Sequence, residues 1–167
     1  MSVFAFGAMY GGTEDVTSAF LQLGVACIGW EPSNPPTAIA SPHDGDAPFP
    51  EGVLHSVKAG DLALIKSFSP SNGLRIKAVG IITDPRPHRI DEDAHYPVSA
   101  LTPGRSDLGY GVKVRWVWPD VQDGTVFWSL TTGDRGDHGR TGTLYEEFGP
   151  EVIAAAIDLL FEPERRQ

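Results

Sequence analysis

Residues 60–82 are GDLALIKSFSPSNGLRIKAVGII, two apolar runs joined by a turn-forming stretch. The first run covers residues 62–68 and the second covers residues 74–82, and both are rich in strand-forming side chains. Between them, Asn72-Gly73 supplies the positive φ angles that a tight hairpin turn requires. The sequence therefore predicts a β-hairpin at the centre of the fold.

Before the hairpin, the sequence predicts a strand, a helix, a second strand and a long loop. The first strand covers residues 2–9, and residues 25–30 form the second. The helix covers about 14–23, because Thr13 has the side chain of an N-cap and apolar residues then recur with helical spacing. Six prolines make residues 31–52 a loop.

After the hairpin, a polar loop over 83–108 is expected, because this segment contains several prolines and acidic residues. Residues 112–118 alternate with a period of two and predict a strand. A further strand is expected over 125–130, and four glycines among polar residues predict a mobile loop over 131–143. A C-terminal helix is predicted over 150–161, with Pro150 at its first position.

Length and composition favour one domain over residues 1–167, with 41% hydrophobic residues. Cys27 is the only cysteine, which excludes an intramolecular disulfide and favours a reducing compartment. The N-terminus has no basic leader and only a short apolar run. These features predict a cytoplasmic protein with no membrane partner.

The charged residues are unevenly distributed along a chain of net charge −9. Residues 1–57 contain six acids and no Lys or Arg, residues 58–115 contain nine bases and six acids, and residues 116–167 contain four bases and ten acids. Such an acidic protein is not a general polyanion binder. The basic middle third favours a specific contact with a polyanion, although ordinary surface variation explains it equally well.

Strand periodicity groups some of these cations. Residues 112, 114, 116 and 118 share one face of their strand, which leaves Lys113 and Arg115 on the other face. Arg75 and Lys77 likewise share a face of the returning hairpin strand. If the two strands are neighbours, these four cations form one stripe on the outside of the sheet.

Four segments carry a resemblance to a known family: CIGW (27–30), VKAGDLALIK (57–66), LRIKAVGIIT (74–83) and VKVRWVW (112–118). Together they resemble the PUA-like superfamily, and most closely its EVE branch, with ASCH and YTH relatives. The resemblance implies an α+β fold, a closed mixed β-barrel with flanking short helices. It also implies a non-catalytic module that recognises a modified or flipped-out base in an aromatic-walled pocket. Residues 131–167 have no counterpart in that pattern.

Aromatic and polar residues near the predicted strand ends are the candidates for the base pocket. Trp30 follows Gly29, which allows close approach, and its indole could stack on a base or merely cap the core. One of Trp116 and Trp118 could form a second wall, although both share a face with valines and could be core residues. Phe68 is the remaining aromatic candidate.

Polar candidates for the same pocket lie on or before the first hairpin strand, with one more near the N-terminus. Lys66 and Ser67 end that strand beside Phe68 and could bind a ligand at the pocket mouth. Asp61 begins the strand and could contact a ligand, although capping of a turn explains it better. Tyr10 precedes the turn that leads to the first helix.

Contacts with phosphate are expected from two groups of residues. The Gly11-Gly12-Thr13 turn precedes a helix N-terminus, where free amides favour an anion, although an ordinary strand-to-helix turn explains it better. The cations expected to contact a nucleic-acid backbone are Lys66, Arg75, Lys77, Lys113 and Arg115.

The sequence contains no recognised enzyme motif, such as G-x-S-x-G or a P-loop, and its five histidines lack a zinc-site spacing. We therefore expect no metal, no cofactor and no catalytic residue. The expected partner is DNA or RNA with a modified or unpaired base. The alternatives are a sensor of a small nucleotide or nucleobase and an ASCH-like ribonuclease that uses Lys66, Tyr10 or a loop histidine.

Overall fold

The computed structural model describes residues 1–10, 14–28, 50–69, 73–90, 108–119, 128–130 and 144–161, which form a mixed α+β fold. In chain order the elements are β1 (Val3–Phe6), β2 (Met9–Tyr10), β3 (Glu14–Asp15), α1 (Thr17–Leu23), β4 (Val25–Cys27), α2 (Pro50–Ser56), β5 (Leu62–Ser69), β6 (Gly73–Arg89), β7 (Tyr110–Trp118), β8 (Trp128–Leu130), β9 (Leu144–Glu146) and α4 (Pro150–Phe161).

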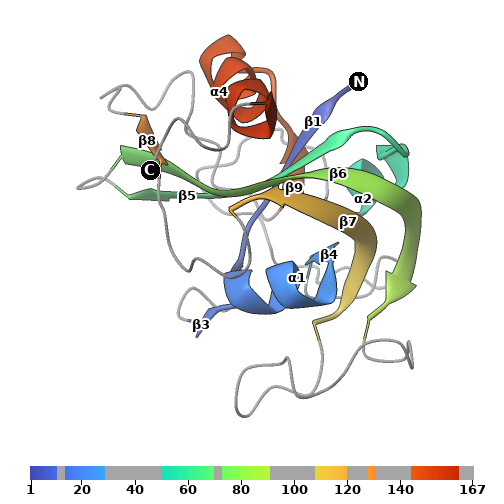
Figure 1. The fold of residues 1–167 in the computed structure, drawn as a ribbon. Helices are drawn as coiled ribbons and strands as arrows, with labels where there is room; N and C mark the ends of the chain where they lie inside the picture. The colour runs from blue at the N-terminus through green and yellow to red at the C-terminus, as the bar shows by residue number, and fades with distance from the viewer. Residues whose placement is uncertain are drawn as a thin grey trace.

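A mixed sheet with the order β4-β7-β6-β5-β1-β9 organises these elements, and β8 pairs with β6 beside this path. β1 and β5 are parallel, and the other pairings are antiparallel. α4 covers one side of the sheet and α1 lies on the opposite side (Figure 1). The expected α+β class with a C-terminal helix is confirmed, and that helix has the predicted bounds.

The sheet is open, so the expected closed barrel is not what the described strands form. β4 and β9 lie at the two ends of the strand order, and no pairing in the described part of the chain joins them. Each of these end strands is only three residues long, which leaves little ladder for closure.

The central hairpin is confirmed, because β5 and β6 pair antiparallel from Leu62 opposite Ile81 to Ser69 opposite Gly73. The loop expected over 83–108 is wrong in its first part, since β6 continues to Arg89. Pro85 and Pro87 do not end the strand, because they lie where the β6–β7 ladder changes register between Asp84 and His88. Proline is tolerated at such irregular positions, where no ladder hydrogen bond from its nitrogen is needed.

Two of the bulges near the centre of the sheet change which side the neighbouring side chains face. Ile65 is opposite Ala78 but Lys66 is opposite Ile76, so Lys77 is an extra residue on β6. Val79 is opposite Trp118 but Gly80 is opposite Trp116, so Val117 is an extra residue on β7. An extra residue reverses the alternation that follows it.

The second bulge corrects the expectation that Trp116 and Trp118 share a face. Trp118 packs with Val79, Leu64 and the α4 residues Val152 and Leu159. Trp116 instead packs against the clusters on the other side of the sheet, which also contain Val112 and Val114. Sequence periodicity could not detect this, because nothing in VKVRWVW marks the position of the extra residue.

The sheet is buried on both sides. The α4 side contains Leu62, Leu64 and Ile76, and the other side contains Ala63, Ile65 and Ala78. α1 contributes Phe20 and α2 contributes Leu54 to the second side, and both side chains are fully buried. Alternate residues of β5 therefore hold two helical layers against one sheet.

The first helix is shorter than expected. It begins at Thr17, because Glu14 and Asp15 pair with Tyr10 and Met9 in the small β2–β3 sheet. Asp15 Oδ1 accepts hydrogen bonds from the Thr17 backbone N–H (3.0 Å) and hydroxyl (2.6 Å). Gly24 ends the helix with φ of 65°, a left-handed conformation that suits glycine.

Two further elements were not expected from the sequence, namely α2, which begins inside the predicted 31–52 loop, and β9. β8 matches the second half of the strand predicted over 125–130. Several predictions lie outside the described residues: the N-cap Thr13, the turn residue Asn72, the remainder of the 31–52 loop and the mobile loop over 131–143.

Candidate functional site

A cationic pair of strands is the clearest candidate for a functional feature among the described residues. We call residues 83–89 of β6 and 110–117 of β7 the basic ribbon. It contains four cations, Arg86, Arg89, Lys113 and Arg115, and a single carboxylate, Asp84. β6 and β7 bend together as they leave the centre of the sheet (Figure 1).

The pairing between β6 and β7 brings these charges together. Ile81 is opposite Arg115, Asp84 is opposite Lys113, and Arg89 is opposite Tyr110. Arg86, Arg89 and Arg115 are exposed, and Lys113 is half-buried. Arg89 shares a face with Tyr110, which packs on the Val112 side, whereas Lys113 and Arg115 face the other side. The ribbon therefore has more cations than carboxylates, distributed over both of its faces, on a protein of net charge −9.

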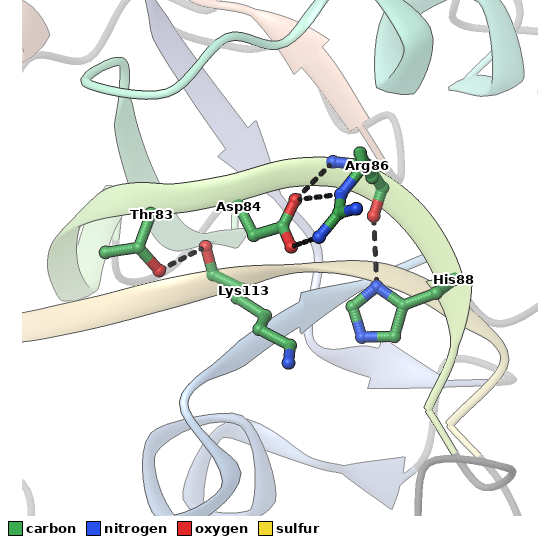
Figure 2. A network of polar contacts seen from close by, with 5 residues as sticks. All are labelled: Thr83, Asp84, Arg86, His88 and Lys113. Carbon is green, nitrogen blue, oxygen red and sulfur yellow. Dashed lines mark hydrogen bonds and ion pairs between the residues drawn. The ribbon is translucent and has the colours of Figure 1, made fainter.

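Asp84 and Arg86 form a planar, two-pronged ion pair at the centre of the ribbon (Figure 2). Arg86 donates from Nε to Asp84 Oδ1 (2.9 Å) and from Nη2 to Oδ2 (2.6 Å), and its backbone N–H also donates to Oδ1 (3.1 Å). These hydrogen bonds hold the pKa of Asp84 far below its ordinary value and raise the pKa of Arg86. The pair is therefore fully charged at neutral pH.

The backbone around this pair is held by further contacts (Figure 2). Thr83 Oγ1 donates to the Lys113 carbonyl oxygen (3.3 Å), and His88 Nδ1 donates to the Arg86 carbonyl oxygen (3.0 Å). Pro85 and Pro87 flank Arg86, and each proline fixes its own φ and restricts the residue before it. Arg86 is thus constrained in both its backbone and its side chain.

The four cations predicted to form one stripe lie on two sides of the sheet. β6 and β7 are neighbours, as expected. Lys113 and Arg115 alternate with Val114, which faces the side covered by α1 and α2, so they face the other side. Lys77 forms an ion pair with Asp15 (2.5 Å) just before α1, and only 9% of its side chain is exposed. Arg75 is half-buried, opposite Ser67 on β5 and Ser129 on β8.

The ion pair with Lys77 changes the titration of Asp15. Burial alone would raise the pKa of Asp15, but hydrogen bonds from Lys77 and Thr17 lower it below its ordinary value. Lys77 therefore links β6 to the start of α1.

Lys66 lies in a buried cluster on the α4 side of the sheet. Its Nζ is 2.5 Å from Glu147 Oε2 and 4.5 Å from the centre of the Tyr145 ring. Glu147 Oε1 accepts a hydrogen bond from the Gly149 backbone N–H (2.9 Å), one residue before α4. The side chains of Lys66 and Glu147 are only 5% and 6% exposed. The pair therefore joins β5 to the start of α4.

Trp116 and Trp118, whose side chains the structure describes, are both packed into the fold. Trp116 is half-buried, and its indole Nε1 donates to the Phe20 carbonyl oxygen of α1 (2.9 Å). Trp118 is buried beneath α4. The sequence left open whether Trp116 and Trp118 line a pocket or belong to the core, and their positions fit the core.

Asp61 has the turn-capping geometry that was the alternative to ligand contact. Its carboxylate accepts hydrogen bonds from the backbone N–H groups of Ser2 (2.8 Å) and Lys58 (2.9 Å). It is buried next to the start of β5.

The other pocket candidates are placed only in part. Ser67 is half-buried on β5, and Tyr10 and Phe68 are described by their backbone alone, in β2 and β5. Gly11, Gly12, Thr13, Gly29 and Trp30 lie outside the described residues. Ile28, directly before Gly29, donates its backbone N–H to the Tyr110 carbonyl oxygen (2.8 Å) at the start of β7.

Sequence reasoning missed Arg86, Arg89 and Asp84 as members of the surface. They lie in DPRPHR (84–89), which its prolines assigned to a loop. The signal in the sequence was that Asp84, Arg86 and His88 alternate with Pro85 and Pro87. Each proline restricts the residue before it to an extended conformation, which is compatible with a strand.

Among the described residues, no three His, Cys, Asp or Glu side chains are grouped so that they could hold a metal ion. In the same part of the chain, no helix has the length and apolar character needed to cross a membrane.

Comparison of the sequence with known proteins gives no match. No protein-family model matches the chain, and no curated protein matches it significantly in sequence.

Proposed function

We propose that the protein is a non-catalytic nucleic-acid-binding module with a PUA-like fold, and that it recognises a modified or unpaired base in DNA or RNA. The observation that carries this proposal is the basic ribbon, where four cations and one carboxylate lie on two paired strands. Phosphate contacts supply most of the non-specific affinity for nucleic acid. A local cationic strip gives an acidic protein such contacts without general attraction to polyanions.

In this proposal the base pocket adjoins the Tyr110 end of the ribbon. The backbone of Ile28 is hydrogen-bonded to Tyr110, and the chain continues from there into Gly29 and Trp30. Trp30 is proposed as the stacking wall, since a base stacked on an aromatic ring gains roughly 1–3 kcal/mol. Lys66, Lys77 and Trp118 are assigned no ligand contact, because they are buried in other contacts.

The first experiment measures fluorescence anisotropy with short DNA and RNA oligonucleotides. Each is plain or carries 5-methylcytosine, 5-hydroxymethylcytosine or N6-methyladenine, and binding is measured at two salt concentrations. We expect a preference for one modified base that persists at the higher salt concentration. Trp30→Ala should abolish that preference while leaving the circular dichroism spectrum unchanged.

The ribbon is tested with a charge-matched pair of variants. Arg115→Gln removes an exposed ribbon cation, and Lys58→Gln removes an exposed lysine that lies before β5 and outside the ribbon. We expect Arg115→Gln to weaken binding to every oligonucleotide and to reduce the salt slope by about 0.7 for single strands. Lys58→Gln should cause a clearly smaller loss.

Three outcomes would contradict the proposal. Absence of binding to any oligonucleotide would exclude it, and saturable, salt-independent binding of a mononucleotide would instead establish a small-nucleotide sensor. Equal losses for Arg115→Gln and Lys58→Gln would show that the ribbon is not the binding surface.

A further inference from the structure

Arg86 has the geometry of an arginine prepared for a second planar partner. A guanidinium group has five N–H donors in a fixed plane. The Asp84 carboxylate accepts hydrogen bonds from Nε–H and from one N–H of Nη2, which lie on one edge of that plane. The third nitrogen, Nη1, carries no dashed line and lies on the side away from Asp84 (Figure 2). The terminal edge, formed by Nη1 and the second N–H of Nη2, is left for another acceptor pair.

This terminal edge is accessible, since 85% of the Arg86 side chain is exposed. Among the described residues, Asp84 is the partner of the Arg86 side chain, through Nε and Nη2. The constraints from Asp84, Pro85 and Pro87 hold the guanidinium in one orientation before any ligand arrives. A pre-oriented side chain loses less conformational entropy on binding, so its hydrogen bonds contribute more to affinity.

The charge of Asp84 decides which acceptor pair suits this edge. A phosphate carries a full negative charge and would be repelled by the adjacent carboxylate. A neutral base edge with two parallel acceptors keeps both hydrogen bonds without that repulsion. Guanine presents such a pair, O6 and N7, and paired hydrogen bonds from arginine to these atoms are the commonest specific contact in nucleic-acid recognition.

We propose that Arg86, oriented by Asp84, donates two parallel hydrogen bonds to O6 and N7 of a guanine in the bound nucleic acid. This inference rests on the proposed function and specifies its ligand further. The guanine lies on the basic ribbon, outside the pocket assigned to Trp30. Asp84 is a positioning residue, and Arg86 makes the contact.

The test replaces guanine with 7-deazaguanine, which lacks only the N7 acceptor. The probes are a labelled thymine oligonucleotide with central guanines and the same oligonucleotide with 7-deazaguanine, each as a single strand and as a duplex. We expect the parent protein to bind the guanine probe about tenfold more tightly, in the lower part of the range for such contacts because only one of the two acceptors is removed. Arg86→Gln should bind both probes equally, and more weakly than the parent binds 7-deazaguanine, because the variant also loses the hydrogen bond to O6.

Asp84→Asn separates orientation from charge. The amide can accept only one of the two side-chain hydrogen bonds, so the guanidinium is no longer fixed, while the ribbon loses its only carboxylate. We expect tighter binding to both probes together with a several-fold smaller preference for guanine. Arg115→Gln is the matched control and should weaken both probes equally while keeping the preference.

The outcomes distinguish this inference from the proposed function. If the parent binds neither probe and no other oligonucleotide, the proposed function fails. If it binds both probes with equal affinity, nucleic-acid binding stands and the guanine contact is overturned. If Arg86→Gln weakens both probes by the same factor, Arg86 contacts phosphate and the inference is likewise overturned. Thermal unfolding of each variant verifies that the fold is retained.

Discussion

Gly111 lies where β7 passes closest to β4. A Cβ atom at this position would meet the Ala26 carbonyl oxygen and lie 2.6 Å from Cys27 Sγ. The Ala26 oxygen belongs to the backbone of the neighbouring strand and cannot move without disturbing the ladder, in which Gly111 is opposite Cys27. Glycine is therefore required here by the close approach of two strands.

We expect Gly111→Ala to lower the free energy of unfolding by about 1–3 kcal/mol, the usual cost of overpacking a buried site. Urea denaturation measures this loss. Gly60→Ala serves as the comparison, because a Cβ there meets nothing within 4 Å and only the φ of 88° is unfavourable. A Gly111→Ala protein as stable as the parent would mean that β4 and β7 can separate at no cost.

Tyr145 has a hydroxyl group that is buried without a hydrogen-bond partner among the described residues, and the residue is only 3% exposed. Its ring, by contrast, is in contact with the Lys66 ammonium group. A buried polar group without a partner costs about 1–3 kcal/mol, so the ring and the hydroxyl have opposite effects on stability.

Tyr145→Phe keeps the ring and removes the hydroxyl. We expect the free energy of unfolding to stay the same or to rise by about 1 kcal/mol. Tyr145→Leu, which removes the ring as well, should be destabilising. Urea denaturation of both variants measures the difference, and a loss of stability in Tyr145→Phe would show that the hydroxyl has a stabilising partner.

At the scale of elements, Asp15 joins α1 to β6 through Lys77. The pKa of Asp15 is lower in the folded protein than its ordinary value of 3.8. A carboxyl group with a depressed pKa stabilises the fold above its unfolded pKa, and the stabilisation disappears as the pH falls through the folded pKa. Because the Asp15 side chain is 46% exposed, solvent screening limits the effect to less than about 1 kcal/mol.

We therefore expect Asp15→Asn to be slightly less stable than the parent at pH 7. The difference should shrink as the pH falls below about 4. Urea denaturation between pH 3 and pH 7 measures it, and the same substitution in a Lys77→Met background should have a smaller effect. A difference that is constant across this pH range would mean that the ion pair does not contribute.

The elements that sequence reasoning predicted are those with strong local signals. The hairpin has two apolar runs and a turn, and α4 has a proline at its start and a helical apolar pattern. The shift of α1 to Thr17 and the short strands β3 and β9 depend on pairing with distant residues, which periodicity does not contain. The bulges at Lys77 and Val117 are likewise set by the sheet.

The same distinction applies to the candidate site. Lys113 and Arg115 were predictable, because regular alternation along β7 placed them on the other face of the strand from Val112 and Val114. Lys66 and Lys77 were expected to contact a ligand, but each is paired with an acid from a distant segment, the buried Glu147 and the exposed Asp15 respectively. Glu147 is 81 residues from Lys66 along the chain, and no local pattern connects them.

At the scale of the whole molecule, one sheet separates two buried layers. Leu159 of α4 belongs to the layer on one side, and Phe20 of α1 belongs to the layer on the other. Both layers use alternate residues of the same strands β5 and β6, so neither can lose its packing without exposing one face of the shared sheet. This arrangement favours a single cooperative unfolding transition.

We expect Leu159→Ala and Phe20→Ala each to lower the free energy of unfolding, by about 2–5 and 3–5 kcal/mol respectively, since both side chains are fully buried. In each variant, unfolding followed by far-UV circular dichroism and by tryptophan fluorescence should give the same midpoint. Trp118 lies on the α4 side and Trp116 on the α1 side, so Trp118→Phe and Trp116→Phe proteins show which layer the fluorescence reports. If fluorescence from the α4 side changed at a lower urea concentration than circular dichroism in Leu159→Ala, α4 would unfold separately, and the sheet would not couple the two layers.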